Sequence, residues 1–332
     1  MRRYQFMFRS AIFICLLVSF DYAFAGYEQH PNAIKLVESL VSEHEFEKSE
    51  LIELFSKTNK QQSILDAISK PAEKTKPWHE YRKIFMGQKR IDQGVEFWKS
   101  NEATLKRASE KYGVPASIIV AIIGVETRYG NFMGKYRVMD ALSTLSFDYP
   151  KRAKFFTRQL KEFLILAREQ GLDPLTLKGS YAGAMGYGQF MPGSYRAYAV
   201  DFDGDKKIDI WTNQDDAIGS VANYFKRHRW KAGQPVVARA SVKDGYDSSI
   251  LNKKGKPKLT LTELKARGFA IDDKTIPALD MDTKALALKL KQVKGNEFWL
   301  GFQNFYVITR YNHSHLYAMA VWQLSQAIEQ AK

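Results

Sequence analysis

The sequence contains almost no cysteine and no compact zinc-binding motif. Cys15 is the only cysteine in 332 residues, which excludes a scaffold held together by disulfide bonds. The six histidines are scattered and no HExxH motif occurs. His313 and His315 are two residues apart, a spacing that does not put both on one face of a helix, so we interpret them as incidental. The composition, 45% hydrophobic and 26% charged, is that of an ordinary globular protein.

The first 25 residues predict a signal peptide. A basic segment, MRRYQFMFR, precedes the apolar segment AIFICLLVSF, and Ala23-Phe24-Ala25 forms an A-x-A cleavage site before Gly26. The apolar segment is short for a membrane span, which favours cleavage over an uncleaved anchor. Cys15 lies within this segment, but bulky residues precede it where a lipidation motif has small ones. We therefore expect a soluble periplasmic protein that is peripheral to the cell envelope and has no lipid anchor.

Positive charge exceeds negative charge along the whole chain. The formal net charge is +14, and removal of residues 1–25 takes away three arginines and one aspartate, which leaves +12. Such a protein favours polyanionic partners. An export signal argues against nucleic acid, so an anionic polymer of the cell envelope is the better match.

The chain is predicted to be mainly helical, with a β-rich segment late in the sequence. Residues 27–112 space their apolar side chains by three and four, as amphipathic helices do. The following run, ASIIVAIIGVETRYG, is apolar all round, which predicts a buried central helix that ends near Gly130 with that glycine as its cap. From 236 to 300 short β-prone pieces (PVVARASV, KLTLTEL, ALALKLKQV) alternate with turns, and a final helix is expected over His315 to Ala331.

Glu126 is the one carboxylate at the end of the apolar run. Burial and the negative end of a helix dipole both disfavour its charged form, so it is expected to stay protonated near neutral pH, as a general acid must. The alternative is a structural ion pair with Arg128 or another base.

A glycine-rich stretch, GSYAGAMGYGQFMP, spans residues 179–192. Small residues let a ligand approach the backbone closely, while Ser180 and Gln189 can supply hydrogen bonds. The stretch lacks the Gly-Lys-Ser/Thr ending of a phosphate loop, and its spacing does not fit a dinucleotide fingerprint. Tight packing of a turn against a helix remains the alternative.

The stretch DFDGDKKID, residues 201–209, places three aspartates at positions 1, 3 and 5 of a loop. This pattern suits a hard cation with oxygen ligands, but the match to an EF-hand loop is partial. Gly204 falls at position 4 and Thr212 at position 12, so Asp215 or Asp216 would have to be the late ligand of a longer loop. A solvated acidic turn is the alternative.

Together GVETRYG, GSYAGAMGYGQFMP, the DFDGD loop and NFYVITRYNHSHLYAMAVWQL resemble the lytic transglycosylase B family of bacterial murein-cleaving enzymes. The resemblance runs from about residue 30 to the C-terminus. It implies an α+β, mainly α fold with a lysozyme-like core. The corresponding segments are a helical domain over 26–110, the catalytic core over 111–235, a small inserted antiparallel β domain over 236–300, and a segment returning to the core over 301–332.

The resemblance also implies the site residues. Glu126 would be the catalytic acid/base. The residues lining the sugar cleft would be Ser180, Gln189, Tyr224, Tyr311, Asn312 and Tyr317. An enlarged EF-hand-like loop would hold a structural calcium through Asp201, Asp203, Asp205, the Lys207 carbonyl and Asp215. The many aromatic side chains (17 Tyr, 21 Phe, 6 Trp) include flat faces that suit sugar rings.

The activity implied is cleavage of the β-1,4 bond between N-acetylmuramic acid and N-acetylglucosamine in peptidoglycan glycan strands, with formation of a 1,6-anhydro sugar. Two alternatives stay open at this point. One is a hydrolytic muramidase that uses the same glutamate with water. The other is a non-catalytic, calcium-stabilised murein-binding protein, although a pure binder has no need of a buried acid.

Overall fold

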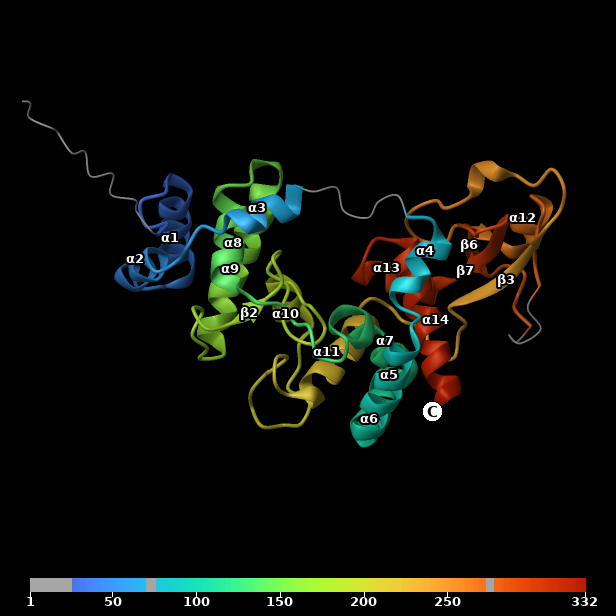
Figure 1. The fold of residues 1–332 in the computed structure, drawn as a ribbon, viewed down its shortest axis with the longest axis horizontal. Coiled ribbons are helices and arrows are strands. Elements are labelled where there is room, and N and C mark those ends of the chain that lie inside the picture. Colours follow the sequence, from blue (N-terminus) through green and yellow to red (C-terminus); the bar gives the residue numbers. More distant parts are fainter. Residues whose placement is uncertain (1–25, 70–75, 273–277) are drawn as a thin grey trace, which may run out of the picture.

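A computed structural model describes residues 26–69, 76–272 and 278–332 (Figure 1). The predicted signal peptide, residues 1–25, lies outside the described residues. The described chain is mainly helical and also contains one five-stranded antiparallel sheet, which confirms the expected fold class. No single described helix is long and apolar enough to cross a membrane. Two helices, α6 (Glu102–Tyr112) and α7 (Ala116–Thr127), pass that test only as a pair, and they are bent by 113° where they meet.

The helices are α1 (Pro31–His44), α2 (Lys48–Ser56), α3 (Gln62–Ser69), α4 (Trp78–Tyr81), α5 (Gln88–Ser100), α6 (Glu102–Tyr112), α7 (Ala116–Thr127), α8 (Val138–Phe147), α9 (Ala153–Glu169), α10 (Pro192–Tyr198), α11 (Gln214–Arg227), α12 (Leu261–Ala266), α13 (Gln303–Tyr311) and α14 (His315–Ala331). Short 3₁₀ turns are η1 (Arg82–Ile84), η2 (Pro150–Arg152) and η3 (Ser248–Ile250). The strands are β1 (Tyr136–Arg137), β2 (Lys178–Gly179), β3 (Val237–Val242), β4 (Leu259–Thr260), β5 (Phe269–Ile271), β6 (Lys284–Lys291) and β7 (Asn296–Gly301).

Helix α7 is the buried central helix that its apolar sequence predicts. All residues from 117 to 124 are buried, and α5, α6, α11 and α14 pack around them. The expected glycine cap was wrong, because the helix ends at Thr127 and its C-cap is Arg128, with φ 52°. The Thr127 side chain closes the helix early: its Oγ1 accepts the N–H of Gly130 at 3.0 Å. Glu126 therefore lies in the last turn, as predicted.

The helices before α7 pack in two different places. α1 and α3 lie against α9 and α8, and α2 packs on α1. α5 and α6 instead lie beside α7, α11 and α14 (Figure 1). A hydrogen bond from the backbone N–H of Asn59 to Asp140 Oδ1, at 2.9 Å, joins the first group to α8. The helices before α7 thus cover two separate surfaces of the core. The domain boundaries predicted from the sequence remain a prediction.

The β unit is a single antiparallel sheet with strand order β4-β6-β7-β3-β5. Its side chains alternate between two apolar clusters, as a sheet buried on both faces requires. Leu288 and Trp299, which are partners across β6 and β7, belong to the main core. Ala287 and Leu300, the neighbouring pair, belong to a smaller core that α12 covers. The β unit therefore has its own apolar layer and is also packed onto the helical core.

The expected strands PVVARASV and ALALKLKQV are confirmed as β3 and β6, but the strand expected at KLTLTEL was wrong. Only Leu259 and Thr260 pair as β4, and the chain then enters α12. Thr260 caps that helix by accepting the N–H of Glu263, whose side chain in turn accepts the N–H of Thr260. This capping box overrides the alternation of apolar residues that suggested a strand.

The last two helices return the chain to the core. α14, the final helix expected from the sequence, packs against both α7 and α5. Trp322 of α14 contacts Trp299 of the sheet edge-on, with ring centroids 5.2 Å apart. The first turn of α14 consequently lies beside the last turn of α7, which joins residues 191 positions apart in the sequence.

Candidate active site

The Glu126 carboxyl is surrounded by protein on most sides yet keeps part of its surface accessible. Burial raises the pKa of this carboxyl to about 7, and a hydrogen bond from Tyr317 acts in the opposite direction. The structure offers no ion pair for it within the described residues. Arg128, the suggested partner, is exposed, and its guanidinium lies over the Phe132 ring at 5.1 Å from the centroid. Glu126 is thus available as a proton donor near neutral pH.

Two tyrosines from the C-terminal helices lie near the acid, and one of them, Tyr317, contacts it. Tyr317 of α14 donates its hydroxyl to Glu126 Oε1 at 2.5 Å. Burial and the nearby carboxylate raise the pKa of Tyr317 well above its ordinary value, so the hydroxyl stays protonated and remains a donor. Tyr311, at the end of α13, donates to the carbonyl of Gly188 at 2.5 Å. Burial raises the pKa of Tyr311, and the charge of Glu126 adds to this effect.

The glycine-rich loop lies against the segment that follows α7. Gly134 shows how close the approach is, because a Cβ there would lie 2.0 Å from the Gly179 carbonyl oxygen, and its φ of 102° is in the region that favours glycine. Ser180 Oγ accepts the N–H of Ala184 at 3.0 Å. Gln189, with φ 49°, donates from Nε2 to the Met133 carbonyl at 3.1 Å. Both polar side chains therefore hold the loop as well as being candidates for substrate contact.

A cavity of about 880 Å³ adjoins this loop. Four of the predicted cleft residues line it: Gln189, Tyr224, Tyr311 and Asn312. Ser180, Glu126 and Tyr317 are not among its lining residues. The Tyr224 hydroxyl donates to the Arg310 carbonyl at 2.6 Å, and its ring stacks on His228 with centroids 4.0 Å apart.

Several lining residues were not found from the sequence. Arg152, Arg158 and Glu162 come from η2 and α9, and Tyr198 and His228 come from α10 and the end of α11. Along α9 the lining residues Phe155, Arg158 and Glu162 are spaced by three and four, which marks a helix face but carries no chemical signature. His313, interpreted as incidental, also lines the cavity.

The predicted calcium loop brings three carboxylates together. Oxygens of Asp201, Asp203 and Asp205 lie within 4.8 Å of one another. Gly204, with φ 87°, lets the loop turn tightly enough for this. All three side chains also accept backbone N–H groups of the loop, as when Asp201 Oδ1 accepts from Gly204 at 2.7 Å. Hard oxygen donors in this number and spacing fit a divalent cation.

The structure does not bring Asp215 into that cluster. Its carboxylate accepts from Thr104 Oγ1 at 2.6 Å and lies 3.4 Å from Arg107 Nη2, so it faces α6. Asp216, the other late candidate, is fully buried and accepts the N–H groups of Phe202 and Asp209. Its role is to fasten both ends of the loop. The role of the Lys207 carbonyl as a calcium ligand stays a prediction.

Comparison with known proteins shows the family of the chain. Residues 29–326 match the family described as "Transglycosylase SLT domain". The membrane-bound lytic murein transglycosylase B of Escherichia coli (strain K12) is 46% identical over 315 residues, which are 92% of this chain and 85% of that protein.

The chain belongs to the SLT transglycosylase family. It acts on peptidoglycan as a lytic murein transglycosylase, which confirms the enzyme expected from the motifs.

Solved transglycosylase structures superpose over nearly the whole chain. Soluble lytic transglycosylase SltB1 from Pseudomonas aeruginosa is 53% identical with a TM-score of 0.86, covering 91% of this chain and 99% of that one. Escherichia coli Slt35, solved in complex with calcium, is 44% identical with a TM-score of 0.84, covering 94% and 98%. The transglycosylase fold is thereby confirmed for this chain.

Proposed function

We propose that Glu126 is the single catalytic acid/base of this transglycosylase. The observation that supports this most strongly is its pKa of about 7 combined with the hydroxyl of Tyr317 on its Oε1. Among the described residues, Glu162 is the one carboxylate that lines the neighbouring cavity, and it pairs with Arg196 Nη1 at 2.5 Å. That ion pair gives Glu162 a structural partner.

One carboxylate suffices if the substrate provides the nucleophile. Ordinary glycosidases use two, one as acid and one as nucleophile or base. Here protonated Glu126 gives its proton to the oxygen that joins N-acetylmuramic acid to N-acetylglucosamine, and the bond from that oxygen to C1 breaks. The resulting carboxylate then takes the proton of the muramyl 6-hydroxyl as O6 bonds to C1. The proton balance closes, no water is consumed, and a 1,6-anhydro sugar forms.

We further propose that Ser180, Gln189, Tyr224, Tyr311, Asn312 and Tyr317 form the sugar-binding cleft. The cavity supports this for the four of them that line it. The tyrosine rings offer flat apolar faces. Gln189 and Asn312 add amide donors and acceptors, and sugar rings require this combination. The remaining two act through contacts nearby: Tyr317 on the acid and Ser180 on the loop.

Mass analysis of the products tests the proposed chemistry. Purified peptidoglycan glycan strands should yield muropeptides about 18 Da lighter than the corresponding hydrolysis products, because one water is absent. The same digestion with a hydrolytic muramidase provides the reference masses. Products that all carry the mass of added water would defeat the single-carboxylate mechanism and favour hydrolysis.

We also propose that the loop of Asp201, Asp203 and Asp205 binds calcium and stabilises the fold. The clustered oxygens support this, and the calcium complex of Slt35 shows that a relative binds this ion. When bound, the ion would neutralise three carboxylates that otherwise repel one another. The loop is tied to α11 by the Asn213 side chain, which donates to Asp203 Oδ2 at 2.8 Å.

Calcium is therefore expected to raise the melting temperature relative to a chelator. A ligand present at 100 times its dissociation constant stabilises the native state by about 2.7 kcal/mol. Asp203→Ala should abolish the difference between the two melting curves. Asp244→Ala, which removes an exposed aspartate of the β unit, should preserve it. Identical curves for the unmutated protein with calcium and with chelator would contradict the proposal.

The relative's name and the murein substrate support a location in the cell envelope. We propose that residues 1–25 are removed on export, so that the enzyme acts in the periplasm on peptidoglycan. The A-x-A site and the basic and apolar segments before it support this. N-terminal sequencing of the exported protein should begin at Gly26; a sequence beginning upstream would contradict it.

A further inference from the structure

A cavity of about 340 Å³ lies on the β unit, and we refer to it as the lysine pocket. Its rim is formed by four exposed lysines on the turn between η3 and β4: Lys253, Lys254, Lys256 and Lys258. The other residues that line it are buried or half-buried and apolar: Ile250, Leu259, Ala285, Leu286 and Ala287. The pocket therefore combines a cationic rim with an apolar floor, and no aspartate or glutamate lines it.

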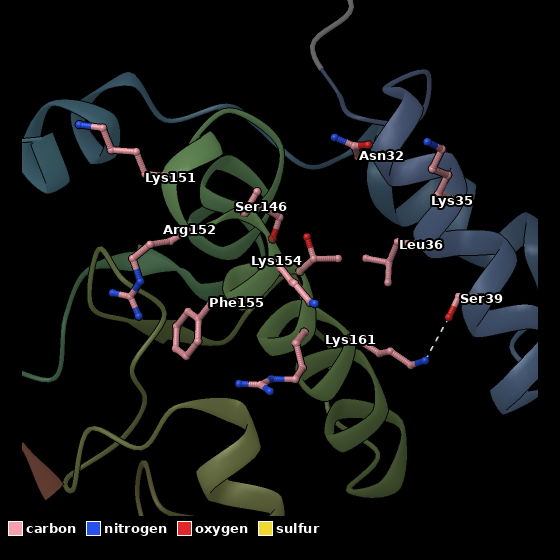
Figure 2. A pocket seen from close by; sticks show the side chains of 13 residues that line it. Asn32, Lys35, Leu36, Ser39, Ser146, Lys151, Arg152, Lys154, Phe155 and Lys161 are labelled. Carbon is pink, nitrogen blue, oxygen red and sulfur yellow. Dashed lines mark hydrogen bonds between the residues drawn. The ribbon is translucent and has the colours of Figure 1, made fainter. Parts of the chain in front are cut away.

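The charge of this rim is not neutralised by the protein. Among the described residues, no carboxylate forms an ion pair with any of the four lysines. A second basic cavity, between α1 and the start of α9, differs in this respect (Figure 2). There Lys161 pairs with Glu43 at 2.6 Å and donates to Ser39 Oγ at 3.0 Å. An anion at the lysine pocket is thus attracted by several unpaired charges at once.

The turn that carries the lysines is fixed to the edge of β6. The backbone N–H of Asn252 donates to the Ala287 carbonyl at 2.9 Å. The Asn252 side chain accepts the N–H of Lys289 at 3.0 Å and donates to its carbonyl at 3.2 Å. Because Asn252 occupies these groups of the strand edge, an extended peptide cannot pair with them. The pocket is therefore preformed, and a partner that adds a strand at this place is excluded.

The tip of the β6–β7 hairpin has the same combination of charge and apolar surface. Val293 is 77% exposed, and the exposed Lys291 and Lys294 stand on either side of it in the sequence. The tip follows Lys289, to which Asn252 is bound, by a few residues along the chain. Apolar groups surrounded by lysines suit the boundary between water and lipid, where ammonium groups meet phosphates and apolar groups enter the headgroup layer.

We propose that the lysine pocket binds the phosphate headgroups of an anionic phospholipid membrane and so holds the enzyme at a membrane surface next to the murein. Four lysines are as many as membrane-binding polybasic segments use. A phospholipid supplies negative charge and apolar atoms in one molecule, whereas a free anion would cover only the rim. This binding goes beyond the cleavage of murein and rests only on the proposed location in the cell envelope.

Neutralising two of the lysines tests this inference. The variant Lys253→Gln/Lys256→Gln changes two exposed side chains and should melt like the unmutated protein. Its control, Lys99→Gln/Lys106→Gln, makes the same change of charge at exposed positions of α5 and α6. The three exported proteins are sedimented with vesicles that contain phosphatidylglycerol and with vesicles of phosphatidylcholine alone. Any contribution of the N-terminal segment is common to all three proteins.

On vesicles that contain phosphatidylglycerol the pocket variant should bind about 30-fold more weakly than the unmutated protein, because each lysine near an anionic surface strengthens binding about fivefold. The difference should shrink at high salt, since the charges are exposed. The control variant should bind like the unmutated protein, and vesicles of phosphatidylcholine should bind all three weakly. Cleavage of soluble glycan strands should be equal in all three, because the substituted residues do not line the active-site cavity. If none of them cleaves, the proposed chemistry is wrong and the vesicle result still stands.

Four outcomes would overturn the inference. An unchanged affinity of the pocket variant for the anionic vesicles would show that the lysines do not meet the membrane. An equal loss in the control variant would assign the binding to net charge. Full displacement from the vesicles by soluble glycerol phosphate would assign the pocket to a free anion. Weaker binding of the pocket variant to intact murein, with vesicle binding unchanged, would assign the lysines to the polymer.

Discussion

Glu126→Gln is expected to lower the turnover of murein by about 10²- to 10⁴-fold, the range that general acid–base catalysis contributes. Glutamine has the same shape and keeps an oxygen for the Tyr317 hydroxyl, but it neither donates the proton to the leaving oxygen nor accepts one from the 6-hydroxyl. Binding of murein should persist, because the cleft residues are unchanged. The rate of product release and the binding to intact murein are measured separately.

The matched control is Glu162→Gln. Among the described residues it removes the one carboxylate that lines the neighbouring cavity, and that carboxylate is already paired with Arg196. With a single acid/base this variant should lose less than about tenfold in kcat. A loss as large as that of Glu126→Gln would indicate two catalytic carboxylates. Full activity of Glu126→Gln would remove Glu126 from the mechanism.

Glu126→Gln should also change how the free energy of unfolding depends on pH. The pKa of Glu126 is about 7 in the folded protein, against an unperturbed value of 4.5. Because the folded state holds the proton more tightly, its stability falls as pH rises from 4.5 to about 7. The loss is less than about 3 kcal/mol, since the side chain retains some exposure. Glu126→Gln does not titrate, so its advantage in melting temperature should be larger at pH 8 than at pH 4.

Local sequence patterns predicted the elements that build the site better than they predicted its contacts. The apolar run from Ala116 to Val125 can only be buried, and this fixed both α7 and the place of Glu126 at its end. The residue at which α7 ends depended on a hydrogen bond of the Thr127 side chain, which the spacing of apolar residues does not predict. KLTLTEL alternates like a strand, but its Thr260 and Glu263 also form a capping box, and that local interaction decided in favour of α12.

Contacts between distant segments could not be read from residue spacing. Tyr317 was identified as a site residue only through the family resemblance, because nothing in its neighbourhood indicates a partner 191 residues away. The three aspartates of the loop were predictable because they are local, whereas Asp215 faces α6 through Thr104. The cavity between α1 and the start of α9 was not predicted at all, since it forms only when α1 lies against α9.

Tyr317→Phe is expected to lower kcat by about 10- to 100-fold and to shift the pH dependence, because it removes a hydrogen bond to a charged group that is worth about 1.5–3 kcal/mol. That bond favours the ionised form of Glu126 and so opposes the effect of burial on its pKa. Without it the pKa of Glu126 should rise above 7.

The first step needs the protonated acid, so activity of the unmutated enzyme should fall as pH rises through about 7. In Tyr317→Phe this midpoint should lie at higher pH. The loss of kcat follows from the second step, in which the carboxylate is less well oriented and less stable as an anion.

Tyr224→Phe is the control, because its hydroxyl also donates within the site but to the Arg310 carbonyl at 2.6 Å. Both substitutions keep a buried ring, so a purely structural effect should lower activity without moving the pH midpoint in either variant. Profiles of kcat against pH for the two variants and the unmutated enzyme separate these cases. A midpoint in Tyr317→Phe that matches the unmutated value would show that its hydroxyl does not tune Glu126. A midpoint shifted to lower pH would contradict the proposed direction, because it would mean that the hydroxyl stabilises the protonated acid rather than the carboxylate.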